Sequence, residues 1–211
     1  MADEQAAPSP EPSASVPRAP EPRITDLDAL KVFTHPLRIR IYRALFTSRE
    51  ATASRLADQV DEAVSLVSYH LRKLAAHGFI VEAPGRGGDG RERWWKLSSD
   101  RGFSFRNSDF DDRPEGVAVL GEVTRQLLAT RAERYARYLD GQAAWPRRWT
   151  EAAFSSEYMP RLTAAELQEM AEEIGDLMWR WTERGRAAEE AGDTEGREHV
   201  AVHMYGFPHR D

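Results

Sequence analysis

The chain has 211 residues, 41% of them hydrophobic, which is enough for one or two cores of ordinary size. It contains no cysteine, so disulfides, thiolate metal sites and cysteine nucleophiles are excluded. No stretch approaches the roughly 20 apolar residues of a membrane span, and the N-terminus lacks the layout of a secretion signal. We therefore expect a cytoplasmic protein without a membrane partner.

The net charge of −6 would argue against a polyanionic partner if it were evenly spread, but it is not. Residues 23–98 carry 13 basic against 9 acidic side chains, whereas residues 99–211 carry 15 against 22. Only the first of these segments is net positive, so the acidic total does not exclude nucleic-acid binding by that segment.

Residues 1–22 consist largely of Ala, Pro, Ser and Glu, with almost no large apolar side chain. Such a composition cannot bury enough apolar surface to offset the entropy of ordering the chain. We predict a disordered tail.

Hydrophobic spacing predicts four helices between residues 27 and 77. The first is short, over 27–33, and the second begins at Pro36, where the missing N–H of proline is harmless. The third spans about 52–60 and the fourth about 64–77, with Val64, Val67, Leu71 and Leu74 expected to face inward. Gly78 is placed to end the fourth helix.

The period then changes to that of a β-hairpin. Residues 79–83 and 93–97 are strand-like, and the loop between them is rich in glycine and arginine. Adjacent residues of a strand point to opposite faces, so we expect at least one of Trp94 and Trp95 to lie in the core rather than serve as a stacking platform for single-stranded nucleic acid.

In the C-terminal half, residues 116–140 read as a long amphipathic helix, with apolar positions at Val117, Leu120, Val123, Leu127, Leu128, Tyr135 and Tyr138. A capping box from Thr163 to Glu166 opens another helix, which runs to about Ala191. Residues 153–159 and 199–207 are strand candidates.

These elements predict a mainly α (α+β) protein with three parts. Residues 1–22 form the tail, residues 23–98 a winged helix-turn-helix domain, and residues 99–211 a mostly helical region with a few strands for dimerisation or ligand sensing. In such a layout the second helix of the pair enters the major groove and the hairpin reaches neighbouring phosphates.

With the apolar stripe of the fourth helix buried, its hydroxyl and cationic side chains face outward, where they suit base edges and phosphates. These candidate DNA-binding residues are Ser65, Ser68, Tyr69, Arg72 and Lys73. In the hairpin, the candidate residues are Arg86, Arg91 and Arg93, placed around glycines that allow close backbone approach to a polyanion.

Three ordered motifs carry a direct resemblance: THPLRIRI at residues 34–41, SLVSYHLRKLAAHGFI at 65–80 and GRERWWKL at 90–97. Together they resemble the ArsR-type winged-helix transcriptional regulators over about residues 25–98. The resemblance implies a homodimer that binds an operator with two-fold symmetry. It also places Ser68, Tyr69, Arg72 and Lys73 on the family's recognition helix, and the three arginines of the hairpin on its wing.

The chain departs from the family at the turn before that helix. Asp61, Glu62 and Ala63 stand where the family usually has a glycine, an apolar residue and a capping residue, and alanine is a poor cap. Without cysteine or a dense histidine cluster, the thiolate metal sensing found in the family is excluded. His70 and His77 are better explained as structural or surface histidines, and we predict neither a metal nor a cofactor.

A two-fold operator requires a two-fold protein. The helix that opens at Thr163 and the long helix that begins at Gly116 each carry an apolar stripe, and we assign the dimer interface to these two helices. The resemblance suggests that the short first helix adds to it. The predicted homodimer interface comprises Leu27, Leu30, Leu167, Met170, Ile174, Met178 and Trp181.

We therefore predict a sequence-specific regulator of transcription that binds double-stranded DNA as a homodimer, with a possible small-molecule effector. The alternative is a winged-helix interaction module that controls a partner protein, favoured by the acidic bulk and by the Asp61-Glu62 pair near the DNA-binding face. An enzyme is not expected, because the chain has no phosphate-binding glycine loop, zinc-protease histidine pair or nucleophile motif.

Overall fold

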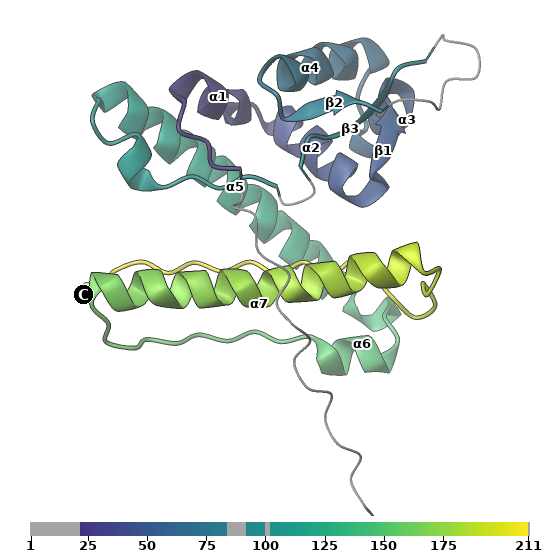
Figure 1. Cartoon of the computed structure of the whole chain (residues 1–211). Helices are drawn as coiled ribbons and strands as arrows, with labels where there is room; N and C mark the ends of the chain where they lie inside the picture. Colours follow the sequence, from purple (N-terminus) through teal and green to yellow (C-terminus); the bar gives the residue numbers. More distant parts are fainter. Residues whose placement is uncertain (1–21, 84–91, 100–101, 211) are drawn as a thin grey trace, which may run out of the picture. The chain divides into compact units, whose positions relative to one another are not determined.

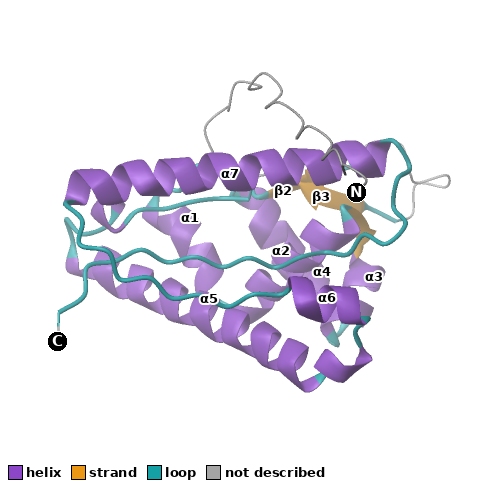
Figure 2. Ribbon diagram, turned by 90° about the horizontal axis from the view of Figure 1, so that it is seen from below, coloured by secondary structure: helices purple, strands orange, loops and turns teal. Residues whose placement is uncertain are grey.

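The computed structural model describes residues 22–83, 92–99 and 102–210. Helices make up most of this part of the chain, and the strands form one small sheet (Figure 2). The described residues divide into two compact units, one of residues 22–159 with 198–205 and the other of residues 160–197 with 206–210. The predicted tail lies outside the described residues, apart from Pro22. None of the described helices combines the length and the apolar character needed to cross a membrane.

In the first unit, the four helices predicted between residues 27 and 77 are confirmed. They are α1 (Leu27–Lys31, extended by the 3-10 helix η1, Val32–Thr34), α2 (Pro36–Ser48), α3 (Ala53–Val60) and α4 (Val64–Ala76). Local capping explains three of the starts. Asp26 accepts a hydrogen bond from the Ala29 amide, and Thr52 accepts one from the Arg55 amide. The ring of His35 accepts one from Leu37 at the start of α2.

A three-stranded antiparallel sheet lies beside these helices (Figure 1). Its strands are β1 (Glu50–Thr52), β2 (Ile80–Glu82) and β3 (Trp94–Leu97), in the order β1-β3-β2. β2 and β3 are the predicted hairpin, whereas β1 was not anticipated from the sequence. The winged helix-turn-helix fold, with a mostly helical chain around a small sheet, is confirmed.

One hydrophobic core joins α1, α2, α3, α4 and the sheet. Its fully buried side chains include Leu30, Phe33, Ile39, Ile41, Leu45, Leu56, Val67, Leu71, Leu74 and Ile80. Trp95 is also buried, so the prediction that one of the two tryptophans lies in the core is confirmed.

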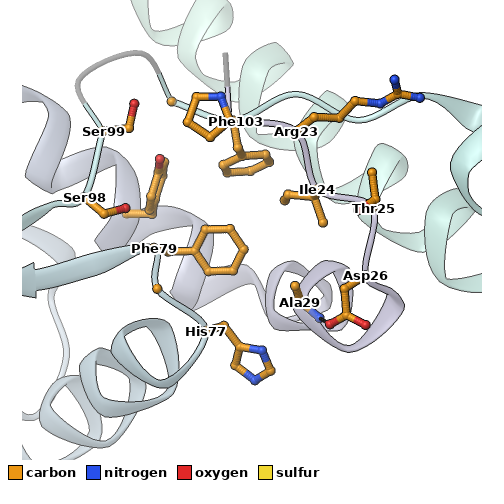
Figure 3. Close-up of a pocket in the computed structure, with 14 residues that line it drawn as sticks. Arg23, Ile24, Thr25, Asp26, Ala29, His77, Phe79, Ser98, Ser99 and Phe103 are labelled. Carbon is orange, nitrogen blue, oxygen red and sulfur yellow. Dashed lines mark hydrogen bonds between the residues drawn. The ribbon is translucent and has the colours of Figure 1, made fainter. Parts of the chain in front are cut away.

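Aromatic rings connect η1 to the residue before β2 and to the segment after β3. The ring of Phe33 lies 4.6 Å from that of Phe79 and 4.2 Å from that of Phe103. The backbone of Ile24 also donates a 2.8 Å hydrogen bond to Ser104. Ile24, Phe79 and Phe103 line a pocket of about 240 Å³ at this junction (Figure 3).

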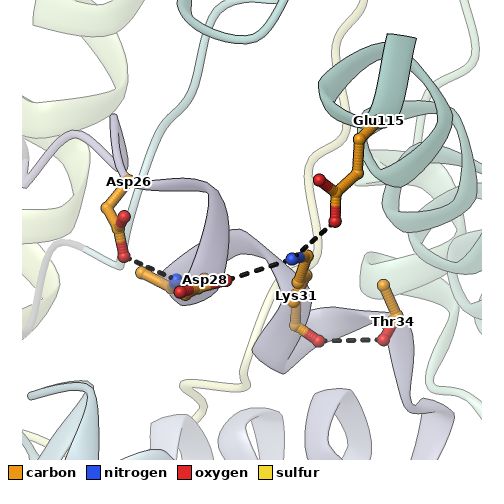
Figure 4. A network of polar contacts seen from close by, with 6 residues as sticks. Asp26, Asp28, Lys31, Thr34 and Glu115 are labelled. Atoms are coloured by element: carbon orange, nitrogen blue, oxygen red, sulfur yellow. Dashed lines mark hydrogen bonds and ion pairs between the residues drawn. The ribbon is translucent and has the colours of Figure 1, made fainter. Parts of the chain in front are cut away.

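The long helix α5 (Pro114–Asp140) belongs to the same unit and packs against α1 and η1. Leu120, Val123 and Leu127 enter the common core, whereas Val117 and Leu128, which the sequence also assigned to the apolar face, are 52% and 42% exposed. An amphipathic stripe is wider than the surface that α1 and η1 offer, so its edges stay in solvent. Ion pairs add to this contact: Lys31 bridges Asp28 at 3.1 Å and Glu115 at 2.8 Å (Figure 4).

Three short helices flank α5 in the sequence. The 3-10 helix η2 (Asn107–Asp109) precedes α5, and η3 (Gln142–Ala144) and α6 (Arg147–Ala152) follow it. The second unit contains α7 (Ala164–Glu190), and the capping box predicted at its start is confirmed, with the Thr163 amide donating to Glu166 at 2.7 Å.

Residues 153–159 and 199–207 were predicted as strands, and this is wrong. Neither segment forms a strand in the described structure. A strand requires a neighbouring strand that is hydrogen-bonded to it along the backbone, and among the described residues neither segment pairs with one. Alternating apolar residues alone, such as Phe154 and Tyr158, therefore do not produce a sheet here.

The first turn of α5 allows a test of this packing. A Cβ atom at Gly116 would overlap with the backbone carbonyl of the buried residue Phe110, whereas one at Gly121 would meet only the mobile end of the Arg125 side chain, at 3.3 Å. We expect Gly116→Ala to lower the free energy of unfolding by about 1–3 kcal/mol. Gly121→Ala, the matched control on the same helix, should be neutral or raise it by up to about 1 kcal/mol. Urea unfolding followed by circular dichroism measures both, and equal effects would contradict the packing described.

Candidate nucleic-acid interface

A tight turn joins α3 to α4 and sets the direction of α4. Asp61 adopts the left-handed conformation at φ 50° and ends α3, which explains how this chain manages without the glycine usual at this turn. Arg40, on α2, donates to the carbonyl of Val60 and pairs with Glu62 at 3.4 Å. The turn is thus held from both sides by a residue of the neighbouring helix.

α4 has one buried and one exposed face, as a recognition helix requires. Val67, His70, Leu71 and Leu74 are buried. The residues predicted to contact DNA lie on the other face: Ser65, Tyr69, Arg72 and Lys73 are exposed and Ser68 is half-buried.

Val64 was expected to face inward, and this is wrong: its side chain is 46% exposed, and Leu66 is 40% exposed. Burial on α4 therefore begins only at Val67. Ala63 provides no side-chain cap, as expected, so the first amides of α4 also lack a capping partner from that residue. Exposed apolar side chains beside hydroxyls suit contacts with thymine methyl groups.

The base of the hairpin presents further cations. Arg93 is exposed, pairs with Glu82 at 3.0 Å and lies 5.6 Å from the ring of Trp95. Arg55, on α3, lies 4.8 Å over the ring of the half-buried Trp94. Arg86 and Arg91, predicted to contact DNA from the wing, lie outside the described residues.

A hollow lies where α3, α4 and the base of the hairpin meet. It is lined by Thr52, Ala53, Ser54, Ser68, Arg72, Glu92, Arg93 and Trp95. Two predicted groups, the recognition-helix pair Ser68 and Arg72 and the wing residue Arg93, therefore share one concave surface. Ser54, whose hydroxyl lies 3.3 Å from the Glu92 carboxylate, was not among the residues predicted from the sequence. Its position two residues after the capping residue Thr52, off the apolar stripe of α3, was the available signal.

Behind the exposed face, the rings of His35 and His70 lie with their centroids 4.4 Å apart and are tilted by 51° relative to one another. His70, on α4, is 3% exposed, and neither of its nitrogens has a hydrogen-bond partner among the described residues. Burial lowers the pKa of His70, and the nearby His35 and Arg38 lower it further, against a smaller opposing effect of Glu62. Burial likewise lowers the pKa of His35. Both rings are therefore neutral at pH 7, which fits the expectation of a structural histidine.

The residues predicted for the homodimer interface lie in both units. Leu27 is half-buried and Leu30 is fully buried in the core of its own chain. On α7, Leu167, Met170, Ile174 and Met178 are half-buried and Trp181 is 58% exposed. The described residues bring together no group of three or more His, Asp or Glu side chains that would hold a metal ion.

The histidine pair makes the stability of the first unit depend on pH. A histidine whose pKa is lowered by folding binds fewer protons in the folded state than in the unfolded state. The free energy of unfolding therefore decreases as the pH falls below 6.5, the ordinary pKa of histidine. We expect His70→Leu, which removes two unsatisfied buried nitrogens, to raise the free energy of unfolding by about 1–3 kcal/mol at pH 5 and by less at pH 8. Urea unfolding across this range measures the difference. His77→Leu, at the exposed residue that follows the last turn of the same helix, is the control. An equal pH effect in both variants would show that His70 is not the cause of the pH dependence.

Residues 33–83 match a family described as a helix-turn-helix domain. No curated protein sequence matches the chain. Among solved structures, NadR in complex with 4-hydroxyphenylacetate is similar at 17% identity, with 70% of this chain and 85% of that chain covered and a TM-score of 0.30.

A MarR family transcriptional regulator from Silicibacter pomeroyi is similar at 16% identity, covering 69% of this chain and 71% of that one, with a TM-score of 0.28. Disulfide-formed AbfR is similar at 14% identity and a TM-score of 0.27, covering 50% of this chain and 64% of the AbfR chain. Likenesses this low carry no conclusion about function. The matched family and the observed elements together show that the chain contains a winged helix-turn-helix domain.

Proposed function

We propose that the chain is a non-enzymatic, sequence-specific DNA-binding regulator of transcription of the ArsR type, which acts in the cytoplasm. The observation that carries this proposal is the division of α4: one face is buried in the core, and the other presents Ser65, Tyr69, Arg72 and Lys73 to solvent. Hydroxyl, phenol and cationic groups in one exposed row are the groups that read base edges and phosphates in the major groove.

The wing supplies the second part of the proposed interface. Arg93 lines the same hollow as Arg72, so a duplex whose major groove holds α4 would bring its backbone toward the base of the hairpin. Arg86 and Arg91 extend this cationic edge in the sequence. We assign base contacts to the α4 residues and phosphate contacts chiefly to the wing arginines.

The α4 assignment predicts that Arg72→Ala combined with Lys73→Ala abolishes specific binding while the protein stays folded, because both side chains are exposed. Loss of a base contact and a phosphate contact should weaken operator binding by roughly 100-fold or more and reduce the salt slope. Fluorescence anisotropy with a genomic operator fragment at several salt concentrations measures both.

The matched control is Arg147→Ala with Arg148→Ala, which removes the same charge from exposed positions of α6. It should leave affinity within about twofold, because α6 lies outside the proposed interface. Operator binding by the α4 variant at the affinity of the unaltered protein would overturn the assignment of α4.

We further propose a homodimer that binds a palindromic operator. α7 carries Leu167, Met170, Ile174, Leu177 and Trp181 at alternating spacings of three and four residues, the spacing of helices that pair with one another. None of the residues of this 27-residue helix is buried. A second copy of the same face would cover the stripe, and two copies of α4 would supply the two half-site contacts that a palindrome needs. Leu27 remains a candidate for the interface, but Leu30 is not included because it has no exposed surface.

This interface predicts that Ile174→Glu produces a monomer, since an unpaired charge in an apolar interface costs about 3–5 kcal/mol. Light scattering after size exclusion measures the oligomeric state, and operator binding should weaken in parallel. Glu172→Lys, at an exposed position of the same helix, should remain dimeric. A dimeric Ile174→Glu variant would place the interface elsewhere.

A further inference from the structure

Three arginines from distant parts of the first unit lie close enough to repel one another. Arg43 comes from α2, and Arg131 and Arg134 come from α5. The pKa of Arg43 is lowered to about 10, first by burial and then by the positive charges of Arg134 and Arg131, against an opposing effect of Tyr205. Burial is also the main cause that lowers the pKa of Arg134, followed by Arg137 and Arg131. This cluster is hereafter the arginine cluster.

The segment 198–205 closes the cluster with an aromatic ring and an imidazole. Arg131 donates a 2.8 Å hydrogen bond to the hydroxyl of Tyr205, and its guanidinium lies 5.2 Å from the centre of that ring. The pKa of His203 is lowered by burial and then by Arg131, Arg134 and Arg43. The charged side chains that shift the pKa of His203 are thus all cationic.

Within the described part of the chain, the cluster lacks an ion-pair partner. No carboxylate among the described residues forms an ion pair with any of the three arginines. Elsewhere in the chain guanidinium groups have such partners, as Arg186 does in Glu183 at 2.7 Å and Glu190 at 2.5 Å.

The cluster also contains buried donors without acceptors. Nη1 of Arg43 and Nε of Arg131 are buried and have no hydrogen-bond partner among the described residues. The same holds for the hydroxyl of Tyr138, one turn beyond Arg134 on α5. Unsatisfied buried donors and crowded like charges both destabilise a protein, unless a ligand completes the site.

We propose that the arginine cluster is a binding site for a small molecule that carries at least two negative oxyanion charges, as carboxylates or as phosphate. Guanidinium groups bind both through paired N–H···O hydrogen bonds, and three cations call for more than one negative charge. The bound anion would join α2 of the winged helix-turn-helix domain to α5 and to the segment 198–205. Anion binding does not depend on the proposed function, but its use as an effector signal rests on it.

Inorganic phosphate and citrate are suitable probes, with sodium chloride used to hold the ionic strength constant. Isothermal titration calorimetry and thermal melting of the full chain should show binding and a higher melting temperature with at least one of them. Arg134→Gln should weaken that binding at least tenfold. It should also raise the melting temperature without any probe, because it relieves repulsion in the cluster, whereas loss of a merely structural arginine would lower it.

Arg125→Gln is the matched control, since Arg125 is exposed on the same helix and pairs with Glu122. It should bind the probes as the unaltered protein does. His203 gives an independent readout: a bound anion should raise the pKa of its imidazole, measured by NMR, in the unaltered protein and not in Arg134→Gln. If neither probe binds, or if both variants lose binding equally, the proposal is overturned. Displacement of the probe by duplex DNA of random sequence would overturn it as well.

The two proposals fail in different ways. If the probe binds and DNA does not, the anion site stands and the regulator proposal fails. If the operator binds and the probe changes its affinity in the unaltered protein but not in Arg134→Gln, the site is an effector site. A probe that binds while operator affinity stays the same in both proteins would overturn the effector role alone.

Discussion

Helix α2 is covered by other elements on nearly every side, and the packing of the first unit depends on this burial. This helix contacts η1, α3, α4, β1 and β3, and Leu37, Ile39, Ile41, Tyr42 and Leu45 are all buried along it. A 13-residue helix that is covered so completely cannot direct all its polar residues into bulk solvent. Its arginines must therefore lie at the boundaries between elements, and each does something different there.

Arg40 reaches the carbonyl of Val60 and so fixes the turn into α4. Arg38 lies beside the His35–His70 pair, and its buried Nε has no hydrogen-bond partner in the described part of the chain. Arg43 faces α5 in the arginine cluster. One buried helix thus connects the orientation of the proposed recognition helix with both groups of unsatisfied polar atoms in this unit. A change of charge at Arg43, or a ligand bound to it, would therefore act on α2, the helix that positions α4.

Much of this could be predicted from the sequence because local signals were strong. The proline at the start of α2, the glycine after α4 and the capping box of α7 each specify a helix end through backbone chemistry alone. The exposed face of α4 followed from its apolar spacing, except at Val64, where position along the helix mattered more than periodicity. The strand predicted at 199–207 failed because a strand depends on a partner, which a local pattern does not specify.

The arginine cluster could not have been found in this way. Arg43 belongs to one helix pattern and Arg131 and Arg134 to another, and within each helix they read as ordinary polar positions. Only the packing of α5 beside α1 and η1 brings the two sets together. The missing ion-pair partner is likewise a property of the neighbourhood in space, since Glu133 lies between Arg131 and Arg134 in the sequence and yet pairs with neither of them in the described structure.

Apolar contacts and exposed ion pairs in the first unit respond differently to salt, and this has a practical consequence for work in solution. The contact of α5 with α1 relies on buried Leu120, Val123 and Leu127, and its ion pairs, such as Lys31 with Glu115, are exposed. Apolar burial withstands added electrolyte, whereas interactions between exposed charges are screened over a Debye length of about 8 Å at physiological ionic strength. Raising the salt concentration should therefore dissociate a polyanion from α4 and the wing while the first unit stays folded. Elution from an anionic resin by salt alone would then deliver the protein in its native state.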